Sequence, residues 1–291
     1  MDWNILEQLI SQHSDEAFTI KDKRSVGGGC INEAWKLSGQ GRDWFVKLNQ
    51  SSGLEMFEAE AAGLDEMLGS NSIRVPRPLF TDVVVNHACL VMEYIPLNGA
   101  ANAAAMGEHL AAMHRHSNEQ FGWYRDNTIG STPQINTCNS DWVDFWRHCR
   151  LGVQTDLAAR KGIGHAAVKA CEQLNEHLGE FFTDYQPQPS LLHGDLWGGN
   201  AAYAQSGEPV VFDPACYYGD READIAMTEL FGGFGDTFSD AYQNAWPLDS
   251  GYKVRKLLYN QYHILNHYNL FGGAYGSQVQ HMTEQLLALC R

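Results

Sequence analysis

Residues 190–214 combine side chains whose types and spacing suit the transfer of a phosphoryl group. The stretch reads SLLHGDLWGGNAAYAQSGEPVVFDP, so Asn200 follows Asp195 by five residues and the apolar run Val210-Val211-Phe212 ends at Asp213. Moving the terminal phosphoryl group of ATP to a hydroxyl requires a carboxylate aimed at the acceptor proton and oxygen ligands for Mg²⁺. The sequence therefore predicts Asp195 as the base, and Asn200 and Asp213 as ligands of Mg²⁺.

Two protein ligands are enough for this metal. Hard, strongly hydrated Mg²⁺ is usually held by one or two carboxylates together with water and the phosphate oxygens of the substrate. The alternative interpretation is that His193, Asp195 and Asn200 form a polar turn between two strands. The apolar strand that ends at Asp213 favours the metal site over such a turn.

A glycine-rich turn near the N-terminus is suited to receive the phosphates of ATP. Gly27, Gly28 and Gly29 precede Cys30 and connect two predicted strands. Glycines let backbone N–H groups approach phosphate oxygens without obstruction by side chains. We therefore expect these four residues to bind ATP, the alternative being an ordinary flexible turn.

One lysine on the next predicted strand could reach the same phosphates. Residues 44–48 read WFVKL, and strand alternation turns Lys47 to one face, either over a cleft or toward solvent. A predicted helix follows over residues 54–68, where either Glu58 or Glu60 could pair with Lys47. Helical periodicity barely separates these two glutamates.

The chain is predicted to divide after residue 95. Two further strands run into Glu93, Tyr94 and Ile95, and Pro96 with a change of composition marks a link. Residues 1–95 form an expected nucleotide-binding part rich in strands. Residues 96–291 form an expected helical part that carries Asp195 and the acceptor. The fold class is therefore α+β.

Composition and charge exclude several classes of protein. Charged residues make up only 19% of the chain and hydrophobic residues 44%, as in a globular rather than a disordered protein. The net charge of −15 argues against a nucleic-acid partner, because neutralising phosphates requires a basic face. No apolar run approaches the roughly 20 residues of a membrane span. Seven cysteines without a CxxC pair suit reduced thiols, which predicts a cytoplasmic protein.

The sequence resembles the fructosamine kinase (ketosamine kinase) family over essentially its whole length. The resemblance is carried by HGDLWGGN at residues 193–200 and VVFDPACYYGDREADIAM at residues 210–227. It implies a two-lobed protein-kinase-like fold, with an antiparallel sheet and one main helix followed by a mostly helical lobe. It also implies ATP-dependent phosphorylation of the 3-hydroxyl of ketosamines, the sugar adducts of lysines and small amines, and hence protein deglycation.

The resemblance also implies roles for particular residues. Its ExxGL pattern, present at residues 60–64, favours Glu60 over Glu58 as the partner of Lys47. Residues 93–95 would bind adenine through backbone groups. Asp224 resembles the family aspartate that supports the catalytic loop from behind, and His193 is expected to support the same loop. Aromatic faces bind the C–H surfaces of sugars and polar groups meet their hydroxyls, so the candidates for contact with the sugar are Trp197, His263, Asn266 and His267.

Packing is the alternative role for Trp197, and an ordinary charge at a helix N-terminus is the alternative for Asp224. His114 is interpreted as a packing residue. The segment over residues 121–151, which resembles the family's FG…NTIG…PQ.N…W pattern, receives no catalytic role.

Cys30 is a candidate redox switch. Family members carry a cysteine at this place in the phosphate loop, and in some of them it forms a disulfide between subunits. The chain is thus expected to be a monomer, or a dimer through a Cys30 disulfide; a small residue tolerated in a tight loop is the alternative. Two other functions remain open: a kinase of the same fold acting on choline or an aminoglycoside, and a pseudokinase that binds nucleotide without transfer.

Overall fold

The computed structural model describes residues 1–27 and 32–290, so Gly28, Gly29 and Cys30 lie outside the described residues. The chain forms two compact units. Met1–Asn102 and Ala202–Asp213 make up the first unit, and Ala103–Ala201 and Pro214–Arg291 make up the second. The first unit thus extends past the predicted division at residue 95 and takes in a later hairpin.

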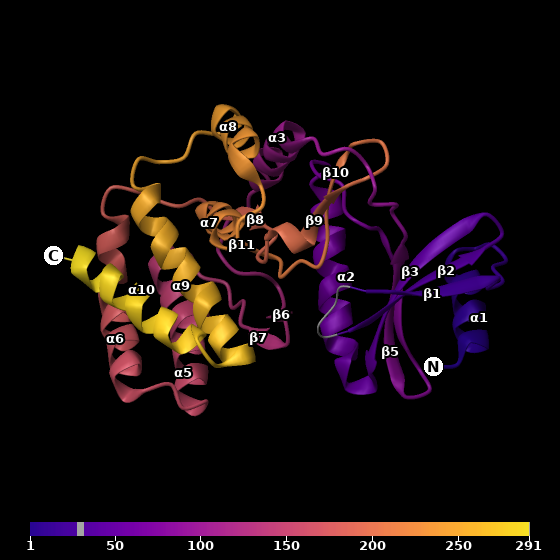
Figure 1. Cartoon of the computed structure of the whole chain (residues 1–291), viewed down its shortest axis with the longest axis horizontal. Helices are drawn as coiled ribbons and strands as arrows, with labels where there is room; N and C mark the ends of the chain where they lie inside the picture. The colour runs from indigo at the N-terminus through magenta and orange to yellow at the C-terminus, as the bar shows by residue number, and fades with distance from the viewer. Residues whose placement is uncertain (28–31, 291) are drawn as a thin grey trace. The chain divides into compact units, whose positions relative to one another are not determined.

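The first unit is built on a five-stranded antiparallel sheet with the strand order β1-β2-β3-β5-β4. Figure 1 labels β1, β2, β3 and β5 of this sheet. On one face, Val46 and Leu48 pack in a core with Leu6 and Ile10 of helix α1. Lys47 lies between them in β3 and therefore points to the other face. The strands are β1 (Asp22–Val26), β2 (Glu33–Gly39), β3 (Arg42–Gln50), β4 (Pro78–Val84) and β5 (His87–Glu93), and α1 spans Trp3–His13.

Helix α2 (Leu54–Gly69) follows a short 3₁₀ turn, η1 (Ser51–Gly53), and packs on β4 and β5. Its buried face includes Phe57, Leu64 and Met67, whereas Leu54 and Leu68 are only half-buried. The sequence shows an apolar stripe along this helix, made of Leu54, Phe57, Ala61, Leu64 and Leu68. Relative to that stripe, the buried face is turned toward Met67. Because Glu60 lies three residues after Phe57 and four before Leu64, it belongs to this face.

A hairpin from later in the chain completes the first unit. Strand β9 (Ala201–Tyr203) pairs with β10 (Pro209–Val211), and the chain then reaches Asp213. The amide nitrogen of Val211 donates to the carbonyl of Arg74 at 3.0 Å. The hairpin thereby fixes Asp213 within the same unit as the five-stranded sheet.

The second unit is mostly helical. Helix α3 packs closely on α8, where a Cβ added to Gly107 would lie 2.5 Å from the carbonyl oxygen of Phe238. Helix α9 packs against α5, α7 and α10, and α6 packs against α10. The helices are α3 (Ala103–His114), α4 (Trp142–Trp146), α5 (Gly152–Arg160), α6 (His165–Glu176), α7 (Glu222–Leu230), α8 (Gly235–Ala245), α9 (Tyr252–Phe271) and α10 (Tyr275–Leu289).

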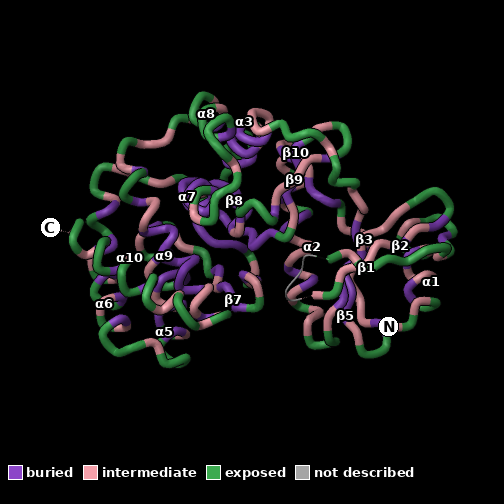
Figure 2. The backbone as a smooth tube through the Cα atoms, in the orientation of Figure 1, coloured by how far each residue is buried: buried purple, intermediate pink, exposed green. Residues whose placement is uncertain are grey.

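Short strands and turns connect these helices. Strand β8 (Ser190–Leu192) pairs with β11 (Tyr217–Gly219), and β6 (Asn127–Ile129) pairs with β7 (Thr132–Gln134). A π-helical turn, η2 (Arg147–Leu151), joins α4 to α5, and 3₁₀ turns lie at η3 (Leu178–Phe182) and η4 (Gly198–Asn200). Figure 2 shows α7 and β8 as mostly buried, so the loop that follows β8 begins from well-packed elements. Among the described residues, no helix is both long enough and apolar enough to cross a lipid bilayer.

Candidate active site

In the first unit, Lys47 lies between two carboxylates. Its Nζ atom is 2.6 Å from Oε1 of Glu60 and also contacts Oδ1 of Asp213. Strand β3, helix α2 and the end of the β9–β10 hairpin each supply one of these three residues. The ion pair of Lys47 is therefore with Glu60 rather than with Glu58, in keeping with the buried face of α2.

The charges of this triad depend on one another. Lys47 is only 6% exposed, and burial opposes its charge, but the nearby Glu60 and Asp213 carboxylates outweigh burial and raise the pKa of Lys47. Burial also raises the pKa of Glu60, which Lys47 partly offsets. The raised pKa keeps the ammonium charged at neutral pH, as binding to phosphates would require. The half-exposed carboxylate of Asp213 leaves room for a further cationic partner.

The predicted adenine-binding residues lie at the end of β5. The amide nitrogen of Glu93 donates to the carbonyl of Arg77 at 2.9 Å, and its carboxylate pairs with Arg74. Tyr94 packs under the ammonium of Lys36, whose Nζ lies 4.2 Å from the ring centre. Since the Glu93 amide is already engaged, the backbone groups of Tyr94 and Ile95 are the better candidates for pairing with a base.

In the second unit, Asp195 and Asn200 form one hydrogen-bonded loop after β8. The Asn200 side-chain nitrogen donates to the backbone oxygen of Asp195 at 2.9 Å and to its carboxylate Oδ2 at 3.3 Å. Because the nitrogen end of the Asn200 amide is used in this way, its Oδ1 is the end left to meet a cation. The Asp195 amide nitrogen approaches Nδ1 of His193 at 3.3 Å, which ties the loop to its first residue.

Asp224 holds this loop through its backbone. Oδ2 accepts a hydrogen bond from the amide of His193 at 2.7 Å, and Oδ1 accepts one from Gly194 at 2.9 Å. Burial opposes the Asp224 carboxylate, but hydrogen bonds and the neighbouring His114 outweigh it and lower the pKa of Asp224. The charged side chain therefore holds the backbone at the start of the loop that carries Asp195.

Gly194 is required where it stands. It has a φ of 81°, and an added Cβ would lie 2.1 Å from the carbonyl oxygen of Ala215. A larger residue would thus displace the chain that follows Asp213.

His114, interpreted from the sequence as a packing residue, has specific partners. Its Nε2 lies 3.1 Å from Oδ2 of Asp224, and its Nδ1 lies 2.7 Å from the hydroxyl of Tyr242. Burial lowers the pKa of His114, so the neutral ring is favoured. A neutral ring that donates from Nε2 to Asp224 accepts from Tyr242 at Nδ1. His114 therefore belongs to the support of the catalytic loop.

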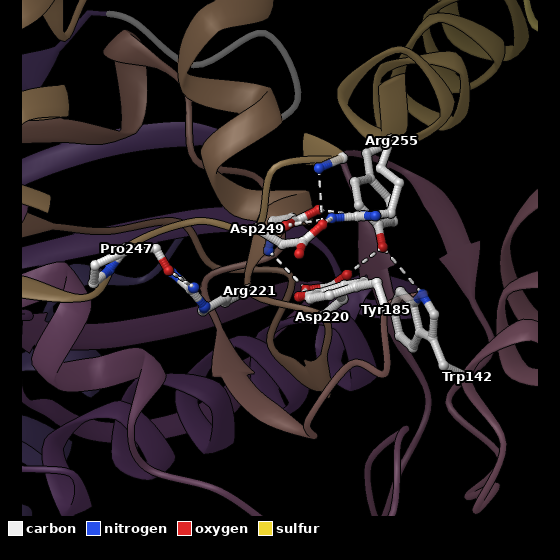
Figure 3. A network of polar contacts seen from close by, with 10 residues as sticks. Trp142, Tyr185, Asp220, Arg221, Pro247, Asp249 and Arg255 are labelled. Atoms are coloured by element: carbon white, nitrogen blue, oxygen red, sulfur yellow. Dashed lines mark hydrogen bonds and ion pairs between the residues drawn. The ribbon is translucent and has the colours of Figure 1, made fainter. Parts of the chain in front are cut away.

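The residues just before Asp224 anchor helix α7 in three directions (Figure 3). Asp220 accepts hydrogen bonds from the hydroxyls of Tyr185 and Tyr259. Arg221 donates to the carbonyl of Pro247 at 2.6 Å. Glu222 binds Arg255 through two hydrogen bonds of 2.7 and 3.0 Å. These contacts fix the start of α7, and through it the position of Asp224.

The donors present fit Mg²⁺ held together with a nucleotide. Asp213 offers a half-exposed carboxylate and Asn200 an amide oxygen, both hard ligands of the kind that Mg²⁺ prefers. Among residues 1–27 and 32–290, no group of three or more His, Cys, Asp or Glu side chains is placed to hold a metal alone. A metal held by either donor would therefore depend on water and phosphate oxygens for most of its ligands.

The four predicted sugar-binding residues differ in exposure. The ring of Trp197 is 42% exposed and lies over Gly199, where a Cβ would come within 2.3 Å of it. His267 is half-buried and contacts the ring of Phe231. His263 and Asn266 are buried in the packing of α9, which argues against direct contact with a sugar. Trp197 and His267 are thus the better candidates.

The segment without a predicted role contributes buried polar contacts. Asn127 donates to the carbonyl of Cys216 at 2.8 Å, and Gln134 donates to that of Ala215 at 3.0 Å. Both carbonyls lie in the segment just after Asp213. In the sequence, polar residues in an irregular stretch resemble a solvated loop, and the partners of Asn127 and Gln134 are distant along the chain. The NTIG…PQ pattern was therefore the only signal in the sequence for these buried contacts.

Comparison with known proteins decides the family. The sequence model of the fructosamine kinase family matches residues 2–289. The chain belongs to the fructosamine kinase family. Within it, the chain is 47% identical to a protein of Synechocystis sp. named as a probable ketoamine kinase, over 99% of this chain and 97% of that protein. It is 43% identical to the chloroplastic protein-ribulosamine 3-kinase of Arabidopsis thaliana, over 92% of this chain and 83% of that protein.

Solved structures agree with this membership in the fructosamine kinase family. A structure described as a fructosamine-3-kinase of Haemophilus somnus superposes with a TM-score of 0.88 at 30% identity, covering 98% of this chain and 97% of that one. An aminoglycoside phosphotransferase at 13% identity superposes with a TM-score of 0.62, covering 99% of both chains, and shows the shared fold alone. The predicted α+β, protein-kinase-like fold is therefore confirmed, as is the family resemblance.

Proposed function

We propose that this chain is an ATP-dependent kinase that phosphorylates the 3-hydroxyl of ketosamines, such as ribulosamines or fructosamines on lysines, in protein deglycation. The observation that carries the proposal is the contact of Lys47 with both Glu60 and Asp213. It brings the candidate phosphate-binding lysine to the candidate metal ligand, 166 residues apart in sequence. The names of the relatives support a ketosamine as the acceptor.

The residues of the first unit bind and orient the nucleotide. Gly27 begins the phosphate-binding turn, whose further residues Gly28, Gly29 and Cys30 lie outside the described residues. Lys47, directed by Glu60, compensates the charge of the phosphates, and Tyr94 and Ile95 offer backbone groups to the adenine. When bound, Mg²⁺ neutralises charge that develops on the transferred phosphoryl group.

The residues of the second unit act on the acceptor and the metal. The carboxylate of Asp195 accepts or orients the proton of the attacking hydroxyl, and Asn200 offers its amide oxygen to Mg²⁺. Asp224 and His193 keep the loop in its shape. Trp197 offers an aromatic face to the C–H surface of the sugar, and His267 a ring nitrogen to a hydroxyl.

A panel of acceptors tests this function. Phosphate transfer from Mg-ATP is measured with ribulose-lysine, fructose-lysine, choline and an aminoglycoside. Transfer to a ketosamine supports the proposal and ranks the sugars. Transfer only to choline or the aminoglycoside would assign another acceptor to the same fold, and ATP binding without any transfer would indicate a pseudokinase.

Two finer parts of the proposal concern Cys30 and the assembly. We propose a monomer that dimerises through a Cys30 disulfide under oxidation, in a cytoplasmic protein, although relatives in plants are named as chloroplastic. Mild oxidant is expected to inactivate the wild-type protein reversibly and to leave Cys30→Ala active, because thiolates near phosphate-binding N–H groups react readily. Equal inactivation of both proteins would exclude the Cys30 switch.

A further inference from the structure

Ala215 and Cys216, which directly follow Asp213 and Pro214, are held by buried amide side chains. The Gln134 side-chain nitrogen donates to the carbonyl of Ala215 at 3.0 Å, and that of Asn127 donates to the carbonyl of Cys216 at 2.8 Å. The amide nitrogen of Ala215 in turn donates to the carbonyl of His193 at 2.8 Å. Ala215 is therefore bonded on one side to the loop after β8 and on the other to β7, and Cys216 is bonded to β6.

The donating side chains are themselves held by a directed series of hydrogen bonds. Oδ1 of Asn127 accepts from Gln134 and from Asn136, both at 2.9 Å. Oδ1 of Asn136 accepts from Nη2 of Arg150 at 2.8 Å, and Oε1 of Gln134 accepts from the hydroxyl of Tyr262 at 2.7 Å. Every one of the three amides thus accepts at its oxygen and donates at its nitrogen.

Arg150 is the charged donor at one end of this series of hydrogen bonds. It is completely buried, and its guanidinium lies 3.9 Å from the ring centre of Tyr217 and 4.7 Å from that of Phe145. The ion pairs among the described residues do not include it. It lies in the π-helical turn η2, a rare geometry that is often found at functional sites. Its charge is therefore directed into carbonyl and amide oxygens, which strengthens hydrogen bonds farther along the series.

We propose that Asn127, Gln134, Asn136 and Arg150 form a polar clamp that positions Ala215 and Cys216, and through Ala215 the catalytic loop, for phosphoryl transfer. The clamp residues are positioning residues, since none of them carries the reacting atoms. Tyr262 adds helix α9 to the clamp through Gln134. The expected effect of the clamp on kcat rests on the kinase activity proposed above. Its expected effect on the structure of the loop does not.

The test compares two buried glutamines of the same unit. Gln134→Met removes the donor to Ala215, whereas Gln261→Met removes an equally buried amide that donates to Thr283 and Val279 of α10. Both variants lose a buried side-chain amide that donates hydrogen bonds from its nitrogen, and both are expected to lose thermal stability. Only Gln134→Met is expected to lower kcat, by about tenfold or more, because one hydrogen bond to the loop is lost. KM for ATP should stay unchanged in both.

Hydrogen exchange tests the clamp independently of the proposed kinase activity. In Gln134→Met, the backbone amide of Ala215 should exchange faster than in the wild-type protein, and in Gln261→Met it should not, whichever acceptor the enzyme uses. Tyr262→Phe, which keeps its ring but loses the donor to Gln134, is a milder variant if Gln134→Met does not fold, and should show a smaller change in the same direction.

The clamp would be overturned if Gln134→Met and Gln261→Met had the same kcat and the same hydrogen exchange at the Ala215 amide. It would also be overturned if Tyr262→Phe matched the wild-type protein in both quantities. Altered exchange at Ala215 without ketosamine phosphorylation by the wild-type protein would keep the clamp and reject the proposed acceptor.

Discussion

Single residues in the candidate site are distinguished by their partners rather than by their types. Glu58 and Glu60 are two positions apart on α2, yet it is Glu60 that lies on the face with Phe57 and Leu64 and reaches Lys47. In the sequence, Glu58 and Glu60 lie on opposite edges of the apolar stripe of this helix, so periodicity alone could not distinguish them. The choice depends on how far the helix is rotated on the sheet, which tertiary packing sets.

Glu60→Gln is expected to weaken the use of ATP. The amide keeps the size of the side chain but loses the charge that directs Lys47, so kcat/KM for ATP should fall by about 10–100-fold, the worth of a charge-assisted hydrogen bond. Steady-state kinetics at varied ATP concentration measure this. Glu58→Gln is the matched control and should stay near wild type; a larger loss in Glu58→Gln would reverse the assignment.

Gly194→Ala is expected to disrupt the catalytic loop. Its φ of 81° disfavours any other residue, and the new Cβ would lie 2.1 Å from the oxygen of Ala215 that Gln134 also binds. We expect transfer to be nearly abolished and thermal stability to fall by about 1–2 kcal/mol or more from the backbone strain alone. The matched control is Gly69→Ala, at a site with open space around the added Cβ. Wild-type activity in Gly194→Ala would show that the loop relaxes at little cost.

At the scale of elements, long periodic segments were predictable and short polar ones were not. Helices α1, α2, α3 and α9 and strands β2, β3 and β5 follow apolar patterns that the sequence displays directly. Strands β6 and β7 have three residues each, too few for a period. Asn127 and Gln134 also bind carbonyls 89 and 81 residues away, so nothing local marks them as buried. The clamp is a property of tertiary contacts.

Helix α9 buries histidines whose protonation opposes folding. Burial, with help from nearby His267 and Arg150, lowers the pKa of His263 to about 3. An unfolded chain has a histidine pKa of about 6.5, so the unfolded state takes up the proton first as the pH falls. The contribution of His263 to the free energy of unfolding should therefore be constant above about pH 6.5. Below about pH 6.5 the free energy of unfolding should decrease, by up to about 1.4 kcal/mol per pH unit.

Chemical unfolding of His263→Gln between pH 4.5 and 6.5 checks this dependence. Groups such as Glu222, whose pKa burial raises to about 7, act in the opposite direction, so the difference between the two proteins is the informative quantity. The variant should lose less stability on acidification than the wild-type protein does. His281→Gln, a change on the exposed side of α10, controls for the replacement of a histidine by glutamine as such. Identical slopes for His263→Gln and wild type would show that His263 is protonated in the folded protein.

At the scale of the whole molecule, the family and fold were predictable because motif residues far apart in the chain agree. The metal-ligand candidate Asp213 and the lysine at position 47 are 166 residues apart, yet both belong to the first unit and touch. The boundary between the two units was less predictable. The chain forms much of the second unit, and residues Ala202–Asp213 then return to the first unit. Composition changes along a sequence cannot reveal such a return.

The role of Asp195 in ketosamine phosphorylation is tested by phosphate transfer from Mg-ATP to ribulose-lysine, measured for the wild-type protein and for Asp195→Asn together with ATP binding by both. We expect a phosphorylated ketosamine from the wild-type protein, a loss of transfer of about 10²–10⁴-fold in the variant, and unchanged ATP binding. Transfer at the wild-type rate by Asp195→Asn, or no transfer to any ketosamine by a wild-type protein that binds ATP, would contradict this role.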